Sequence, residues 1–131
     1  MNVYKIETNL TQAENDKIYD NLSREDKKKI SELNDLGVLA NDVFDEFGHM
    51  TSYMICEKEV INFLVFLFQE NEVKYKINDI TKLFLYGQIS IEDEDFQNVL
   101  KENLDIDTVL DKINEVGIES LTDLDKQILS K

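Results

Sequence analysis

One histidine and one cysteine are present, and they form the only pair in the chain that could act as a thiolate and its base. Cys56 lies in the apolar run TSYMIC, where a free cysteine is typically a small buried hydrophobic residue. No basic residue precedes it to lower its pKa. His49 follows Gly48 at a predicted turn, where a solvated imidazole is ordinary. The pattern favours a protein without catalysis, and the alternative is a small enzyme that uses carboxylates or His49.

Carboxylates are abundant, but their spacing matches no known ligand loop. The run at 92–95 and the pair Asp105 and Asp107 lack the glycine and the glutamate that an EF-hand loop needs at fixed positions. A single histidine with a single cysteine cannot supply the ligands of an ordinary zinc site. No two glycines lie closer than 11 residues apart, which excludes glycine-rich phosphate loops. We therefore expect no metal and no cofactor.

The acidic balance is the strongest compositional feature. The chain has 28 acidic and 14 basic residues, a formal charge of −14, and positions 92–125 hold twelve acids against Lys101 and Lys112. A surface of this sign repels nucleic acid and anionic lipid. It either keeps the protein solvated or meets a basic protein partner. The candidate partner surface consists of Glu92, Asp93, Glu94, Asp95, Glu102, Asp105, Asp107, Asp111, Glu115 and Glu119.

Length and composition indicate one folded domain. A chain of 131 residues that is 42% hydrophobic can bury one core. The start is polar from residue 7 onward, unlike a secretory signal peptide. The longest apolar run, 60–68, is about half as long as a membrane span of roughly 20 residues. Because one cysteine needs no oxidising compartment, we expect a cytoplasmic protein without membrane insertion.

Three segments have the pattern of β-strands, namely 3–7, 51–56 and 73–79. An apolar helix over 57–70 separates the last two, so 51–79 predicts a β-α-β unit, right-handed if its strands pair in parallel. The middle strand in sequence is expected at the centre of the sheet. The helix is hydrophobic on nearly every side, so we expect its burial within the monomer, with a homodimer through it as the alternative.

Helical spacing dominates the remaining chain. Ser23 predicts the N-cap of one helix, and a shorter helical period covers 38–47. Everything after Ile80 has helical character, with Ser90 and Asp105 as N-caps. The predicted class is α+β, a helix-rich single domain with about three strands and a C-terminal helical hairpin. We divide it into an α+β core over 1–89 and an acidic helical part over 90–131.

The last 22 residues predict two short helices joined by a glycine. Gly117 ends the first helix, and Thr122 with Asp125 makes a capping box for the second. Such short helices must pack on something, either the other helices of the domain or a partner. The side chains expected in buried contacts are Ile113, Leu121, Leu124 and Ile128, and those expected in water are Asp111, Glu115, Glu119 and Asp123.

The run LDKI at 110–113, followed by GIESLT at 117–122 and by Leu129, resembles a helical module in the cytosolic tails of certain bacterial and plant rhomboid-family intramembrane proteases. The resemblance covers residues 108–130, and the chain lacks the transmembrane helices that carry the protease serine and histidine. It therefore implies an accessory helical hairpin and no proteolysis. The alternative is convergence, because every feature of the hairpin is general capping chemistry.

These observations together predict a non-enzymatic intracellular interaction or regulatory protein whose acidic helical part meets a basic partner. A toxin-neutralising immunity protein is one concrete instance of this class.

Overall fold

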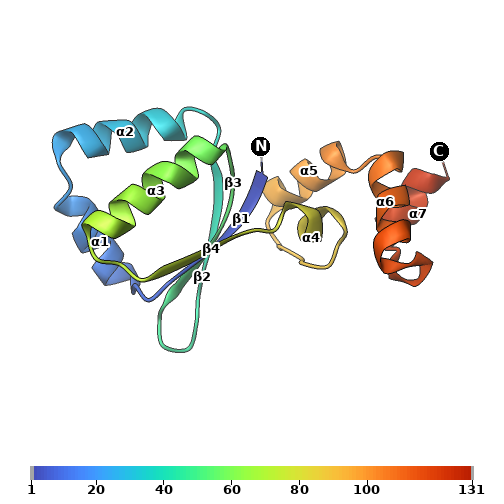
Figure 1. Cartoon of the computed structure of the whole chain (residues 1–131), viewed down its shortest axis with the longest axis horizontal. Coiled ribbons are helices and arrows are strands. Elements are labelled where there is room, and N and C mark those ends of the chain that lie inside the picture. The colour runs from blue at the N-terminus through green and yellow to red at the C-terminus, as the bar shows by residue number, and fades with distance from the viewer. Residues whose placement is uncertain (1, 131) are drawn as a thin grey trace. The chain divides into compact units, whose positions relative to one another are not determined.

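The computed structural model describes residues 2–130, and the chain divides into two compact units, residues 1–80 and 81–131 (Figure 1). The division predicted from the sequence falls between 89 and 90, so residues 81–89 belong to the second unit and not to the first. That the whole chain behaves as one domain stays a prediction.

Unit 1 combines a four-stranded antiparallel sheet with three helices (Figure 1). Its elements are β1 (Asn2–Thr8), α1 (Gln12–Asp20), α2 (Arg24–Asn34), β2 (Leu39–Phe44), β3 (Met50–Cys56), α3 (Lys58–Glu70) and β4 (Tyr75–Asp79). The strand order is β2-β3-β1-β4, and every neighbouring pair is antiparallel. The predicted mixture of helices with a small sheet is confirmed, with one strand more than predicted.

The sheet is built from two interleaved split β-α-β units. β3 and β4 both run antiparallel to β1, which lies between them, so α3 connects two strands of the same direction that are not neighbours. β1 and β2 flank β3 in the same way, with α1 and α2 in their connection. This is the ferredoxin-like connectivity. The unit predicted over 51–79 exists, but its two strands pair with β1 and not with each other.

The helix predicted for 38–47 is wrong, because these residues form β2 and the turn that joins it to β3. The carboxylate of Asp45 accepts the backbone N–H groups of Phe47 and His49, and Gly48 has a φ of 76°, a conformation that suits glycine. Apolar positions 38, 39, 43 and 44 fit either element. Pairing with β3 decides between them, and that pairing is not visible in a short local pattern.

The core of unit 1 lies between the sheet and its helices. Tyr4 and Ile6 of β1 are 3% and 2% exposed and lie on the same face of the strand. They pack in one cluster with Val60 and Ile61 of α3. The helix predicted over 57–70 is confirmed as α3 and is largely buried within unit 1, with Phe66 the only large apolar side chain on it that is more than a third exposed. A homodimer through α3 stays a prediction.

No helix among residues 2–130 is long and apolar enough to cross a membrane.

Unit 2 is helical. It contains α4 (Thr81–Leu85), α5 (Glu94–Asn103), α6 (Ile106–Val116), the short 3-10 helix η1 (Ile118–Ser120) and α7 (Asp123–Leu129). Phe84 of α4 and Phe96 of α5 are fully buried and meet edge to face, with ring centroids 6.2 Å apart. The N-cap predicted at Ser90 is wrong, since α5 begins after Asp93, whose carboxylate accepts the N–H groups of Asp95 and Phe96.

The C-terminal hairpin packs within unit 2, which is one of the two alternatives that the sequence left open. Val109 of α6 and Ile128 of α7 are buried together with Leu104, which follows α5. The other three side chains expected in buried contacts, Ile113, Leu121 and Leu124, are partly buried against this cluster. Gly117 ends α6 with φ 89° and ψ 159°, which is not the left-handed helical conformation but is a region that essentially only glycine adopts.

Replacing Gly117 by valine should lower the free energy of unfolding by about 1–3 kcal/mol, because a β-branched residue is strained at this positive φ. No atom lies within 4 Å of the position that a Cβ would take, so the loss would come from the backbone alone. Asn114→Val, on the exposed face of the same helix, is the matched control and should change stability little. Urea unfolding measures both, and equal losses would contradict the conformational explanation.

Candidate protein-binding surface

The ten acidic residues of the predicted partner surface all lie in unit 2, and all except the half-buried Asp93 are exposed. Total charge does not distinguish this unit. Residues 81–131 contain twelve acidic and five basic residues, and residues 1–80 contain sixteen and nine, so each unit carries −7. What distinguishes unit 2 is therefore the arrangement of its carboxylates on the helices.

Two of the ten carboxylates cap the N-termini of helices. Asp93 caps α5, and Asp105 caps α6 by accepting the backbone N–H and the hydroxyl of Thr108, both at 2.8 Å. These bonds from Thr108 lower the pKa of Asp105. Asp95 is exposed in the first turn of α5. Asp93 and Asp105 thus stabilise the two helices that present six of the other eight acids.

Helix α6 presents a continuous outer stripe of carboxylates. Asp107, Asp111 and Glu115 follow one another at intervals of four residues, so they span about 80° of the helix circumference. All three are exposed. Ile106 and Leu110 lie beside this stripe and are 47% and 46% exposed. We call these five residues the α6 face.

The acids of the α6 face differ in their surroundings. Glu115 accepts a hydrogen bond from the ammonium of Lys82 at 2.5 Å, and this bond raises the pKa of the lysine. The pKa of nearby Tyr86 is also raised, first by burial and then by the negative charge of Glu115. No basic side chain among residues 2–130 forms an ion pair with Asp107 or Asp111. Their charges face solvent.

The opposite side of α6 contains a buried ion pair. Lys112 Nζ lies 2.6 Å from Asp125 Oδ2, and the two side chains are 1% and 2% exposed. The same oxygen accepts the backbone N–H of Thr122 at 2.9 Å, and the N–H of Asp125 donates to the Thr122 hydroxyl at 3.2 Å. Burial by itself would raise the pKa of Asp125, but the bonds from Lys112 and Thr122 outweigh it and lower that pKa. This pair joins α6 to α7.

The capping box of Thr122 with Asp125 was visible in the sequence, but the burial of Lys112 was not. A lysine is normally exposed, and its partner lies 13 residues away. One signal could have indicated it, because Lys112 follows Val109 by three positions and so falls on the buried side of the helix.

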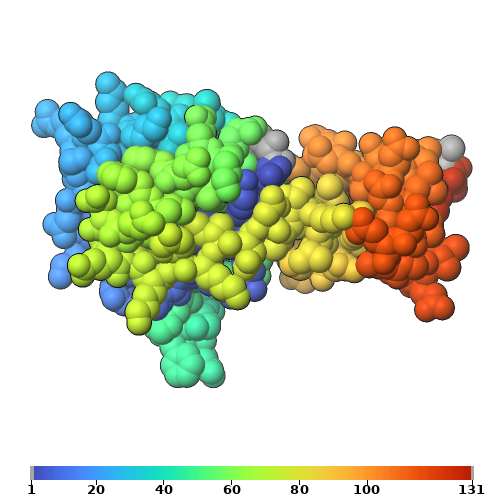
Figure 2. Space-filling view, in the orientation of Figure 1, coloured from blue at the N-terminus to red at the C-terminus, as the bar shows by residue number. Residues whose placement is uncertain are grey.

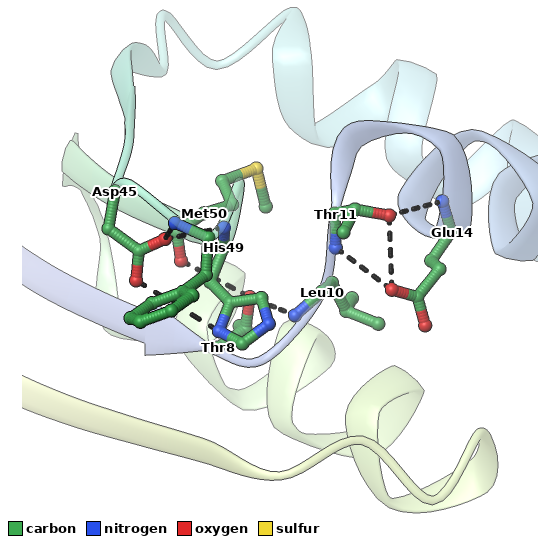
Figure 3. A network of polar contacts seen from close by, with 8 residues as sticks. Thr8, Leu10, Thr11, Glu14, Asp45, His49 and Met50 are labelled. Carbon is green, nitrogen blue, oxygen red and sulfur yellow. Dashed lines mark hydrogen bonds and ion pairs between the residues drawn. The ribbon is translucent and has the colours of Figure 1, made fainter.

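His49 and Cys56 are not brought together. They stand at opposite ends of β3, seven residues apart, which corresponds to about 23 Å in an extended strand. His49 lies in the turn before the strand, with Nδ1 3.9 Å from an oxygen of Asp45 (Figure 3). Cys56 is buried, and burial raises its pKa to about 11. Its thiol is therefore protonated at neutral pH and cannot be activated by His49.

An open cavity of about 290 Å³ beside His49 is the place where a His49-dependent reaction would have to occur. Its charged lining combines Lys74 and Lys76 with Glu7 and Asp45, so opposite charges balance there. Among residues 2–130, no three histidine, cysteine or acidic side chains gather closely enough to hold a metal ion. The enzyme alternative stays a prediction.

Comparisons of the chain with protein-family models, with curated proteins and with solved structures found no match. The resemblance of residues 108–130 to rhomboid-family tails therefore stays a prediction.

Replacing Lys112 by methionine should lower the free energy of unfolding by about 3–5 kcal/mol, because the carboxylate of Asp125 would stay buried without its cation. Lys126→Met removes an exposed lysine from α7 and should change stability by less than about 0.5 kcal/mol. Combining Lys112→Met with Asp125→Asn should recover part of the loss, since it also removes the unpaired charge. Denaturant unfolding measures all three, and similar values for Lys112→Met and Lys126→Met would refute a buried pair.

The stability that Asp125 provides should be lost when the pH is lowered. Its folded-state pKa is lowered, so this stability is fully present above the unfolded-state value of about 3.9 and is lost as pH falls through the folded-state pKa. The difference in unfolding free energy between the natural protein and Asp125→Asn should be constant from about pH 5 to 7 and shrink below about pH 4. A difference that grows on acidification would show a raised pKa instead.

Proposed function

We propose that this chain is a non-catalytic, intracellular interaction module that binds a basic protein segment through the α6 face. The observation that carries the proposal is the presence of exposed carboxylates and exposed apolar side chains side by side on one helix. A stripe of acids alone is typical of a solvated surface. Ile106 and Leu110 give that surface an apolar part that a partner would cover.

The chemistry of the partner follows from the two parts of the face. Lysine or arginine side chains would pair with Asp107 and Asp111, which form no ion pair with any basic residue among positions 2–130. Apolar side chains next to them would bury Ile106 and Leu110. Charge complementarity mainly sets the rate and specificity of such an association, and the buried apolar area contributes more to affinity. An amphipathic basic helix meets both requirements.

Such a module would act by binding its partner, as a regulator or an immunity-type inhibitor does. The packed hairpin of α6 and α7 supports this role, because it holds the α6 face on a fixed side of unit 2. The resemblance to a protease tail is consistent with a hairpin that works by binding.

Binding can be tested with a fluorescent amphipathic helical peptide made of lysine and leucine. We expect saturable binding in about 50 mM salt that weakens strongly in about 500 mM salt. The double change Asp107→Lys with Asp111→Lys should weaken binding by about tenfold or more, and Leu110→Ser should weaken it without changing the salt dependence. Fluorescence anisotropy measures each affinity.

The matched control is the double change Glu25→Lys with Glu32→Lys, which alters the net charge equally on exposed positions of α2. It should leave the affinity nearly unchanged. If both double variants weaken binding to the same extent, only the net charge matters and the α6 face is not the site. A polylysine probe that binds as tightly would exclude a contribution from Ile106 and Leu110.

A further inference from the structure

The second surface of interest is the outer edge of β2 in unit 1. β2 is the first strand in the sheet order and has a strand partner, β3, on one side only. Near its end, Val43 and Phe44 are 49% and 42% exposed. Figure 2 shows the hairpin of β2 and β3 standing out from the body of unit 1. An exposed edge with apolar side chains is a template for pairing with another strand.

The two edges of the sheet are protected to different degrees. β4, the opposite edge, includes Lys76 and is preceded by Lys74, and exposed lysines on an edge discourage pairing. β2 contains one charged residue, Asp42, and its carboxylate accepts a hydrogen bond from the Ser52 hydroxyl of β3. The edge of β2 is therefore the one left open to addition of a strand.

We propose that two copies of this chain pair through β2, antiparallel and about a two-fold axis, so that their sheets join into one. Antiparallel neighbours that face each other point to the same side of a sheet, and side chains alternate between the two sides. A two-fold axis therefore has to place one residue of β2 opposite its own copy. The number of allowed registers is small, and side-chain chemistry separates them.

The register centred on Asn41 fits best. It places Leu39 opposite the partner's Val43, an apolar pair that occurs twice about the axis, and it places Ala40 opposite the partner's Asp42. A centre at Asp42 would place two carboxylates directly opposite each other, which is destabilising. A centre at Ala40 would place Leu39 opposite the partner's Asn41 and would leave Val43 without a partner in β2. Of these three registers, only the one centred on Asn41 pairs Leu39 with Val43 and places no two charges opposite each other.

Salt should affect this dimer and the α6 face in opposite directions. Each chain carries −14, so two copies repel each other and screening by salt favours their association. Binding of a basic segment to the α6 face is an attraction, which salt weakens. β2 lies in unit 1 and α6 in unit 2, so either proposal can fail without the other.

Sedimentation equilibrium of the full chain, from about 5 to 500 µM and in about 50 and 500 mM salt, tests the pairing. We expect a monomer–dimer equilibrium that shifts toward dimer at the higher salt concentration. Val43→Lys should shift it to monomer, because it places an ammonium opposite the partner's Leu39. Asn78→Lys makes the same charge change on β4 and should leave the dimer intact. Both variants lower the net negative charge, which by itself would favour association. Loss of the dimer with Val43→Lys but not with Asn78→Lys would therefore place the interface at β2.

A disulfide measures the register directly. Asn41→Cys should form a disulfide-linked dimer on mild oxidation, because the Asn41 register brings the two Cα atoms within bridging range. Ala40→Cys should not, since its own copy is offset and lies more than about 7 Å away. The natural Cys56 is 1% exposed and does not compete. A chain that stays monomeric under all conditions, a dimer unaffected by Val43→Lys, or equal bridging of both cysteine variants would overturn the proposal.

Discussion

Unit 2 depends on the buried hydrogen bond between Lys112 and Asp125. α6 and α7 have 11 and 7 residues, lengths at which an isolated helix is marginal in water. Their packing must stabilise them, and a directional bond restricts the rotation of a helix about its axis more strictly than an apolar contact does. One carboxylate oxygen of Asp125 accepts hydrogen bonds from the ammonium of Lys112 and from the N–H of Thr122. Because such bonds are directional, the pair fixes which side of α6 faces inward.

The outward side of α6 follows from that constraint. With Lys112 and Val109 held inside, the residues half a turn away must point to solvent, and these are Asp107, Leu110 and Asp111. Replacing the pair by apolar residues of similar volume is often neutral for stability. We therefore infer that the main effect of the Lys112–Asp125 pair is to fix the orientation of α6 and not to add stability. The two units carry equal net charge, so orientation and not total charge makes the α6 face distinctive.

Apart from the N-cap at Ser90, which α5 does not use, the sequence predicted the features whose causes lie within a few residues of one another. Asp105 and the Thr122–Asp125 box are caps that act over three positions, and both are confirmed. β2 was missed because a strand at 39–44 exists only through its pairing with β3. Lys112 was missed because its burial depends on a partner in another helix. Likewise, the exposure of Asp107 and Asp111 was predictable, whereas their place beside exposed Ile106 and Leu110 depends on how α6 packs.

Dimerisation through β2 would affect binding at the α6 face only by changing the number of α6 faces in one particle. A dimer joined through β2 carries two α6 faces, whatever the arrangement of the units, so a partner with two basic segments can gain avidity of about 10²–10⁴ where its linker spans both sites. Salt acts on the two associations in opposite directions, since it screens the repulsion between copies and the attraction to a basic partner. Bivalent binding should therefore pass through a maximum at intermediate ionic strength, whereas binding by a monomer should only decline as salt increases.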